Sequence, residues 1–311
     1  MMDFHHITVL LDETIEQMQI DPSKVYLDGT LGGGGHASAI AAKLTTGRLI
    51  GLDRDEKALT AARERLAPWM DRVTLLHRNF RELDNALDGL GLEAVDGMVF
   101  DLGVSSPQLD DGARGFSYRT DAPLDMRMDA TQRLTAWELV NRWPREQPKR
   151  IFYDYGEERY APQIAAAIEK RRESAPIETT LELVDVIKSA MPPQALREKQ
   201  HPAKRSFQAI RIAVNDELGA LDTLMGMAVD RLNPGGRLAV ITFHSLEDRI
   251  VKSALQEAAR GCVCPPEFPV CVCGRKPKVR LITRKPILPG TRELEANPRA
   301  RSAKLRVAER L

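Results

Sequence analysis

The chain has 311 residues, of which 43% are apolar and 29% are charged, and its formal net charge is +1. This balance is typical of a globular protein and excludes fibrous and largely disordered classes. A run of about eighteen apolar residues is absent from the sequence, which excludes a spanning helix. The first residues lack the order of a secretory signal, and the four cysteines all lie between Cys262 and Cys273. We therefore expect a cytoplasmic protein with no membrane partner.

Charge is unevenly spread along the chain. Residues 275–311 hold twelve Lys and Arg against three acids, and residues 197–211 form a second basic stretch. Residues 81–129 hold eleven acids against four bases. Such asymmetry suits a protein that meets a polyanion on one side, although charge alone favours the simpler interpretation of an ordinary solvated face.

Short apolar strands alternate with helices over the first hundred residues. The pattern predicts strands and helices in the order 25–27 (strand), 36–44 (helix), 48–53 (strand), 56–66 (helix), 73–76 (strand) and 95–100 (strand). This alternation predicts a parallel sheet that is covered by helices on both faces.

The alternation stops at Ser106 and resumes near Lys204. Helices are predicted between these points at 131–143, 161–172 and 180–190, separated by Pro144, Pro148, Pro176 and the pair Pro192-Pro193. Beyond them the pattern predicts a helix over 207–225, a strand at 238–243, a helix at 246–258, and closing strands at 279–283 and 304–308. We therefore expect an α/β protein in which residues 1–105 and 205–311 form one seven-stranded domain, interrupted by a helical insertion at 106–204.

A glycine-rich turn joins the first strand to the first helix. Its four consecutive glycines let the backbone approach a ligand closely, and Gly32-x-Gly34-x-x-Ala37 satisfies the dinucleotide-binding fingerprint. Asp53, about twenty residues further on, can bind the ribose hydroxyls of a nicotinamide or an adenosyl ligand. Asp28 at the entrance of the turn would repel a pyrophosphate, but it suits S-adenosylmethionine, which carries an ammonium and a sulfonium. A nicotinamide oxidoreductase and a turn without a ligand are the alternatives.

A second candidate loop, Asp101-Leu-Gly-Val-Ser-Ser-Pro-Gln108, follows the fourth strand. Ligands of open α/β sheets lie beyond the carboxyl ends of the strands, so this loop should adjoin the glycine turn. The pair Ser106-Pro107 predicts a stiff loop whose carbonyls can accept hydrogen bonds from an exocyclic amine, although Ser-Pro is also common in plain turns.

Seven motifs occur in a fixed order along the chain. They are Asp28-Gly-Thr-Leu-Gly-x-Gly-Gly-His36, Asp101-Leu-Gly-Val-Ser-Ser-Pro-Gln-Leu-Asp110, Arg114-Gly-Phe-Ser117, Pro123-Leu-Asp-Met-Arg-Met128, Tyr155-Gly-Glu-Glu-Arg159, Phe243-His-Ser-Leu-Glu-Asp-Arg249 and Asn297-Pro-Arg-Ala-Arg-Ser302. As a set they resemble the MraW/RsmH family, bacterial methyltransferases that act on the N4 amine of cytidine-1402 in 16S ribosomal RNA. The resemblance implies a class I methyltransferase fold, a doubly wound seven-stranded sheet, with an inserted helical substrate-recognition domain. It also implies S-adenosylmethionine as methyl donor and the small ribosomal subunit as partner.

The resemblance also implies a cofactor site. Its residues would be Gly34, Gly35, His36, Asp53, Phe80, Asp101 and Gln108. The residue types agree, because the glycines permit close approach, Asp53 suits ribose hydroxyls, and Asp101 and Gln108 can bind the adenine or the amino group. The Phe80 ring can pack on adenine, although a core aromatic is the commoner role for such a residue.

The chemistry needs acceptors for the amine hydrogens, because the cytosine N4 lone pair is conjugated with the ring and must be aligned with the sulfonium methyl. Ser106 and the carbonyls flanking Pro107 are the candidates. We expect no metal in the reaction, since the leaving group is a neutral thioether. His244, after the fifth strand, is predicted as a proton acceptor or a positioning residue, with Ser245 capping the next helix.

Two further segments carry predictions. The insertion is expected to hold RNA through Lys199, His201, Lys204 and Arg205 on its return path, with Phe116, Tyr118 and Tyr155 as possible stacking platforms. Core packing is the alternative for each aromatic. Cys262, Cys264, Cys271 and Cys273 can place four thiolates around one zinc ion, or remain reduced in a surface hairpin. A noncatalytic RNA-binding module, suggested by the basic tail, is the second alternative to a methyltransferase.

Overall fold

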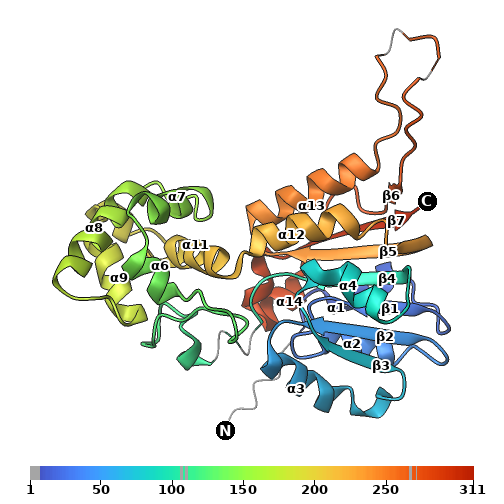
Figure 1. Ribbon diagram of the computed structural model, residues 1–311, viewed down its shortest axis with the longest axis horizontal. Helices are drawn as coiled ribbons and strands as arrows, with labels where there is room; N and C mark the ends of the chain where they lie inside the picture. The colour runs from blue at the N-terminus through green and yellow to red at the C-terminus, as the bar shows by residue number, and fades with distance from the viewer. Residues whose placement is uncertain (1–7, 106–107, 109–110, 266–267, 271) are drawn as a thin grey trace. The chain divides into compact units, whose positions relative to one another are not determined.

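The computed structural model describes residues 8–105, 108, 111–265, 268–270 and 272–311 and divides into two compact units (Figure 1). The first unit comprises Met1–Gly103 and Leu218–Leu311, and the second comprises Val104–Glu217. The sequence placed the end of the insertion near residue 204, whereas the second unit continues to Glu217. The reason is that α11 (Lys204–Asn215) packs against α6 (Ala136–Arg142) and α7 (Glu146–Asp154) of that unit.

A seven-stranded sheet forms the centre of the first unit. Its order is β3-β2-β1-β4-β5-β7-β6. The strands are β1 (Val25–Asp28), β2 (Arg48–Asp53), β3 (Val73–His77), β4 (Val95–Asp101), β5 (Leu232–Thr242), β6 (Val279–Leu281) and β7 (Lys304–Arg310). Strands β1 to β5 pair in parallel, and β7 runs antiparallel to both β5 and β6. This topology confirms the doubly wound seven-stranded α/β sheet expected for a class I methyltransferase.

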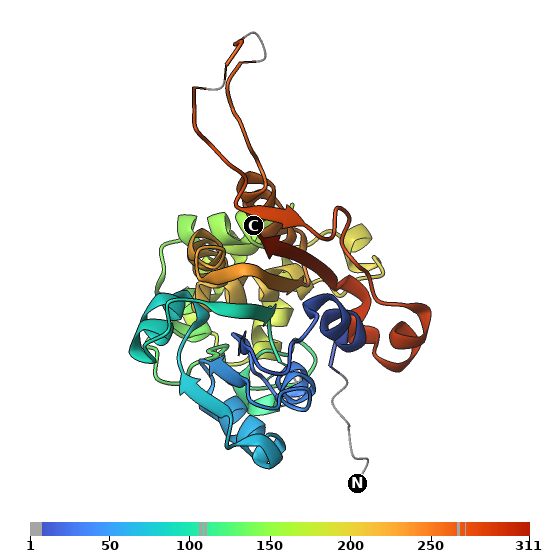
Figure 2. The ribbon, with the colours of Figure 1, turned by 90° about the vertical axis from the view of Figure 1, so that its right-hand side faces the viewer.

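Helices cover both faces of this sheet (Figures 1 and 2). Successive strand residues point to opposite faces, so Leu27 and Met98 pack in one core while Tyr26 and Val99 pack in the other. The helices of the Leu27 face are α4 (Leu83–Gly89), α12 (Glu217–Met227) and α13 (Ser245–Ala258). The helices of the Tyr26 face are α1 (Leu11–Met18), α2 (Gly35–Ala41) and α3 (Glu56–Arg65). Further along the chain lie α14 (Thr291–Ala296) and a 3₁₀ turn at Pro298–Ser302.

The second unit is helical and has its own apolar core. Besides α6, α7 and α11, it contains α8 (Ala161–Ser174), α9 (Thr180–Ser189) and α10 (Pro193–Leu196). Capping boxes start α6 at Thr135 and α9 at Thr179, because each hydroxyl accepts from the N–H of a glutamate three residues later, and that glutamate accepts in return. Within the described part of the chain, no helix has both the length and the apolar character needed to cross a bilayer.

Three local expectations were wrong. The helix predicted over 207–225 is two helices, α11 and α12, separated by Asp216 at φ 47°. The apolar spacing continues across this break, and aspartate tolerates the left-handed region, so periodicity could not reveal it. Pro148 does not separate helices but lies in the first turn of α7, where an N–H has no intrahelical partner to lose. Strand β5 begins at Leu232, six residues earlier than expected, and its register against β4 shifts between Val95 and Gly97.

Candidate active site

Three aspartates end three neighbouring parallel strands at the same edge of the sheet. Asp28 ends β1, Asp53 ends β2 and Asp101 ends β4. The sheet order reverses at β1, with β2 on one side and β4 on the other. Open α/β sheets bind ligands at such a reversal, beyond the carboxyl ends of the strands. The structure therefore brings the three sequence-predicted carboxylates of the first unit together.

Asp28 is the most deeply buried of the three, with 1% of its surface exposed. Its Oδ1 accepts a hydrogen bond from the N–H of Thr30 at 3.1 Å, whereas Oδ2 makes no hydrogen bond of normal geometry to the described residues. Burial raises the pKa of Asp28 to about 7, and the negative charge of Asp53 adds to the shift, against the N–H groups of Thr30 and Ala37. A buried carboxylate with an unsatisfied oxygen is a strong acceptor for a cation or a donor group.

Asp101 lies at the end of β4 in a negative environment. Burial holds its pKa well above the ordinary value, and the charges of Asp28, Glu247 and Glu293 add to the shift. Its Oδ2 lies 3.9 Å from Nδ1 of His36, and its Oδ1 has no hydrogen-bond partner among the described residues. Several carboxylates at one edge repel one another, so this edge favours a positively charged ligand.

Asp53 fixes the glycine turn to the end of β2. Its Oδ2 accepts from the N–H of Gly32 at 2.7 Å, and its Oδ1 accepts from the N–H of Asp55 at 2.8 Å. Burial raises the pKa of Asp53 despite these two donors. Each carboxylate oxygen can accept more than one hydrogen bond, so capacity for ligand hydroxyls remains.

Gly34 and Gly35 of the turn are restricted to glycine by different constraints. Gly34 has a φ of 73°, in the left-handed region that L side chains rarely adopt. At Gly35 a Cβ would lie 1.8 Å from Oγ1 of Thr8, so a neighbour within the chain already excludes a side chain there. Thr30, in the same turn, accepts a hydrogen bond from the N–H of Asp101 through Oγ1. That contact, invisible in the sequence, ties the turn to the end of β4.

Phe80 and Gln108 take other positions. Phe80 begins a 3₁₀ turn after β3, and its partly buried ring packs edge-on against Phe100, with centroids 6.0 Å apart and planes at 76°. Its contact with adenine stays a prediction. Gln108 belongs to the second unit, where it is buried and accepts from the N–H of Ser105 at 3.0 Å. Ser106 and Pro107 lie outside the described residues.

His244, rather than Ser245, caps α13, so the predicted cap was wrong. Nδ1 of His244 accepts from the N–H of Glu247 at 3.4 Å, and Nε2 lies 3.1 Å from Oε1 of the same glutamate. Glu247 Oε2 in turn accepts from the N–H of Phe243 at 2.8 Å. Sequence reasoning missed Glu247, although a glutamate three residues after a helix cap is the usual signature of a capping box. Histidine is an unusual residue at that cap, which hid the pattern.

S-adenosylmethionine fits this donor and acceptor set. Its ammonium and sulfonium are cations, which the unsatisfied oxygens of Asp28 and Asp101 can attract, and its ribose hydroxyls suit Asp53. The open side of the turn at Gly33, where a Cβ would meet nothing within 4 Å, leaves room beside the backbone.

Comparison with known proteins gives one consistent result. The model of the MraW methylase family matches residues 3–311. A ribosomal RNA small subunit methyltransferase H of Brevibacillus brevis is 58% identical over 100% of this chain and 99% of its own, and one of Heliobacterium modesticaldum is 57% identical over 100% of both. Among solved structures, a putative rRNA-methylase of Clostridium thermocellum matches with 13% identity over 99% of this chain and 100% of its own, at a TM-score of 0.45. So weak a structural match adds nothing to the fold that the sheet order shows.

The raised pKa of Asp28 makes stability depend on pH. Between about pH 4 and 7, Asp28 is protonated in the folded chain but ionised in the unfolded chain. The raised pKa therefore stabilises the folded chain at low pH, and this stabilisation is lost as the pH rises through about 7. Asp28→Asn keeps the acceptor for Thr30 but cannot ionise. We expect the variant to be more stable than the parent at pH 8, with an advantage that shrinks by about 2–3 kcal/mol at pH 5.

Urea denaturation at pH 5, 6.5 and 8 measures this difference. Asp222→Asn, which changes an exposed aspartate on α12, is the matched control and should show no such trend. If the difference in unfolding free energy between Asp28→Asn and the parent does not vary with pH, Asp28 does not have the raised pKa assigned to it.

Proposed function

The chain belongs to the MraW methylase family, and from this premise we propose that it transfers a methyl group from S-adenosylmethionine to the N4 amine of cytidine-1402 in 16S ribosomal RNA. The proposed substrate is this RNA in the small ribosomal subunit, as the names of the relatives suggest. The observation that carries the proposal is the group of buried carboxylates around Asp28 and Asp101, with unsatisfied oxygens at the edge where the strands end. A nicotinamide cofactor is disfavoured there, because its pyrophosphate would be repelled.

The cofactor is held, in this proposal, by groups that already have fixed positions. Asp53 binds the ribose hydroxyls while its hydrogen bonds to Gly32 and Asp55 keep the carboxylate in place. Asp28 and Asp101 attract the cationic part, Gly34 and Gly35 form the turn beside it together with His36, and Phe80 and Gln108 are proposed contacts of the adenosyl group. Bound S-adenosylmethionine supplies an electrophilic methyl on a sulfonium, and departure of a neutral thioether requires no metal ion.

The amine is oriented by the loops that follow β4 and β5. Ser106 and the carbonyls flanking Pro107 are proposed to accept hydrogen bonds from the amine, which aligns its lone pair with the methyl group. His244 is proposed as a positioning residue, because its Nδ1 accepts from the N–H of Glu247 and its ring therefore fixes the start of α13. Exclusion of water and correct alignment are the main contributions that such loops can make to a poorly nucleophilic amine.

The second unit is proposed to hold the RNA. Lys199, Lys204 and Arg205 are exposed near the start of α11, where they can contact phosphates. Tyr118 stacks on His201 with ring centroids 4.6 Å apart and planes at 18°, and both remain partly exposed. Phe116 is no platform for a base, because it is 7% exposed and belongs to the core, and Tyr155 packs against that core.

Product identity tests the proposed activity directly. Unmodified small subunits and free 16S ribosomal RNA are each incubated with the protein and labelled S-adenosylmethionine, and the digested RNA is analysed by mass spectrometry. We expect N4-methylcytidine at cytidine-1402 from the small subunits. Label at carbon five of cytosine, or no transfer to either substrate by protein that binds the cofactor, would contradict the proposal. A noncatalytic RNA-binding module would bind RNA without product, and a nicotinamide enzyme would bind NADH in competition.

Asp53→Ala tests the ribose contact. Loss of a charge-assisted hydrogen-bond partner should weaken cofactor binding by about 1.5–3 kcal/mol, or roughly 10- to 150-fold. Because Asp53 also holds the turn, weaker binding alone does not identify the contact. Calorimetry should therefore compare S-adenosylhomocysteine with its 2′-deoxy analogue, which the parent should bind at least about tenfold more weakly. If Asp53→Ala keeps the same discrimination, the hydroxyl is bound elsewhere; Glu56→Ala, at an exposed position on α3, is the control.

The double variant Lys204→Ala/Arg205→Ala tests the RNA-binding role of the second unit. We expect weaker RNA binding. Loss of two phosphate contacts should also make the slope of the log binding constant against log salt concentration shallower by up to about 1.4–1.8. Cofactor affinity should not change. Lys149→Ala/Arg150→Ala removes the same charge from α7, where Glu146 and Asp154 neutralise these residues, and it should alter RNA binding far less. Equal effects of the two double variants would mean that net charge, not a contact surface, governs binding.

A further inference from the structure

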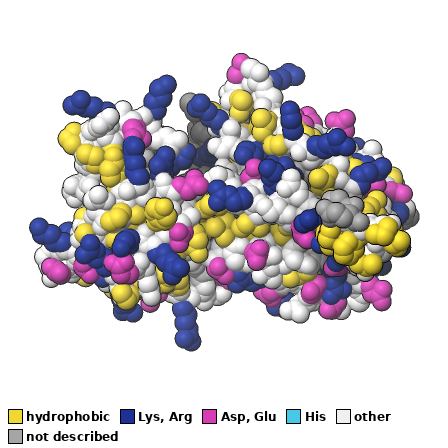
Figure 3. All heavy atoms as spheres, turned by 90° about the horizontal axis from the view of Figure 1, so that it is seen from above, with side chains coloured by type: hydrophobic (Ala, Val, Ile, Leu, Met, Phe, Trp, Pro, Cys, Tyr) yellow, Lys and Arg dark blue, Asp and Glu magenta, His cyan; other side chains and the backbone are white. Residues whose placement is uncertain are grey.

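The described residues between α13 and β6 (259–265, 268–270 and 272–278) extend away from the sheet as the two sides of a long hairpin (Figures 1 and 2). We call it the cysteine hairpin. Its described apolar side chains are largely in solvent, since Val263, Phe268, Val270 and Val272 are 41%, 50%, 69% and 72% exposed. Figure 3 shows hydrophobic side chains gathered at this end of the unit. Burial of apolar surface therefore does not hold the hairpin together.

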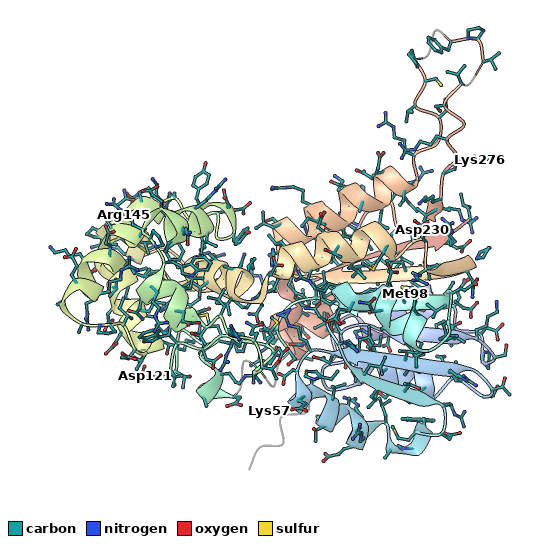
Figure 4. The ribbon with its side chains drawn as sticks, viewed as in Figure 1. Lys57, Met98, Asp121, Arg145, Asp230 and Lys276 are labelled. Carbon is teal, nitrogen blue, oxygen red and sulfur yellow. The ribbon has the colours of Figure 1, made fainter. Side chains whose placement is uncertain are left out.

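Ion pairs secure the base of the cysteine hairpin. Nζ of Lys278 lies 2.7 Å from a carboxylate oxygen of Asp230, and the guanidinium of Arg275 lies 2.7 Å from that of Glu257. Figure 4 shows Asp230 beside the base and Lys276 low on the returning side, close to that base. Ordering the backbone costs about 1–2 kcal/mol per residue, which exposed ion pairs worth about 0–1 kcal/mol each do not offset over such a length. A crosslink between the two sides would add the stabilisation that these ion pairs do not supply.

Three cysteines supply the groups for that crosslink. The Sγ atoms of Cys262, Cys264 and Cys273 all lie within 4.8 Å of one another, and those of Cys262 and Cys273 are 3.7 Å apart. Two sulfurs bound to one tetrahedral zinc at about 2.3 Å each are separated by about 3.8 Å. A disulfide requires about 2.05 Å between its sulfurs, well short of the 3.7 Å that separates those of Cys262 and Cys273. Cys262 and Cys264 lie on the outgoing side and Cys273 on the returning side, so one ion would join both.

Backbone N–H groups donate to two of the three sulfurs. The N–H of Cys264 donates to Sγ of Cys262 at 3.4 Å, and the N–H of Val272 donates to Sγ of Cys264 at 3.4 Å. Such donors stabilise negative charge on sulfur, and metal-bound thiolates commonly receive them. The second contact also crosses from one side of the hairpin to the other.

We propose that Cys262, Cys264 and Cys273 bind one zinc ion and that this ion fixes the shape of the cysteine hairpin. Each thiol releases its proton to solvent as its sulfur binds, and no oxidation or reduction takes place. Three soft thiolates at these separations favour zinc over hard cations such as Mg²⁺ or Ca²⁺. Cys271 lies outside the described residues, and the proposal rests on the other three. The role is structural and independent of the methyl-transfer chemistry.

Metal analysis of the full-length protein tests the proposal. Protein that has been reduced, loaded with zinc and dialysed should hold about one zinc per chain by elemental mass spectrometry, and Cys262→Ser and Cys273→Ser should each retain less than about a tenth of it. Val270→Ser, an exposed change in the same hairpin that removes no sulfur, should retain full occupancy. Circular dichroism of each variant confirms that the sheet is folded.

Two further measurements separate the outcomes. Cobalt in place of zinc should give the visible absorption of a tetrahedral thiolate site, and a chelator should accelerate proteolysis within residues 260–276 while the rest of the chain resists. Zinc absent from the loaded parent, zinc retained by Cys262→Ser, iron as the bound metal, or a disulfide between Cys262 and Cys273 in thiol titration would each overturn the proposal.

Discussion

Parallel pairing of β2, β1, β4 and β5 is the constraint on which the candidate site depends. Parallel strands place all their carboxyl ends at one edge, so residues as distant in sequence as Asp28, Asp53 and Asp101 become neighbours. Two hydrogen bonds refine this arrangement. Asp53 accepts from Gly32, and Thr30 accepts from the N–H of Asp101, so the glycine turn is attached to the strand on either side of β1.

The same arrangement has an electrostatic consequence. Burial raises the pKa values of Asp28 and Asp101, and the charges of neighbouring carboxylates add to both shifts. One oxygen of each has no hydrogen-bond partner among the described residues. Repulsion among carboxylates destabilises an empty cation site, and binding of the cation removes that repulsion. Glu247 extends this pattern, because it both completes the cap of α13 with His244 and adds negative charge near Asp101. The cap and the charge of the site are thus properties of one side chain.

Two segments interrupt the sheet domain, and each is stabilised differently. The second unit has its own apolar core, and buried Asn215 joins α11 to residues 126–128 by accepting from the N–H of Met128 and donating to the carbonyl of Met126. The cysteine hairpin exposes its apolar residues and has ion pairs at its base, so its sulfur atoms become the natural place for a crosslink. A chain can therefore carry a large insertion and a long hairpin on one sheet, provided that each has a local source of stability.

The sequence by itself determined the strand and helix alternation, the family motifs and the carboxylates at strand ends, because hydrophobic period and turn residues are local properties. The tertiary structure decided what depends on distant neighbours. It broke the predicted helix at Asp216, where apolar spacing continues unchanged, and it moved the end of the insertion to Glu217 through the packing of α11. It placed Thr8 where a side chain at Gly35 would collide with it. It also placed Phe116 in a core and paired His244 with Glu247. Each of these outcomes depends on which atoms meet across space, and the period of a sequence does not record that.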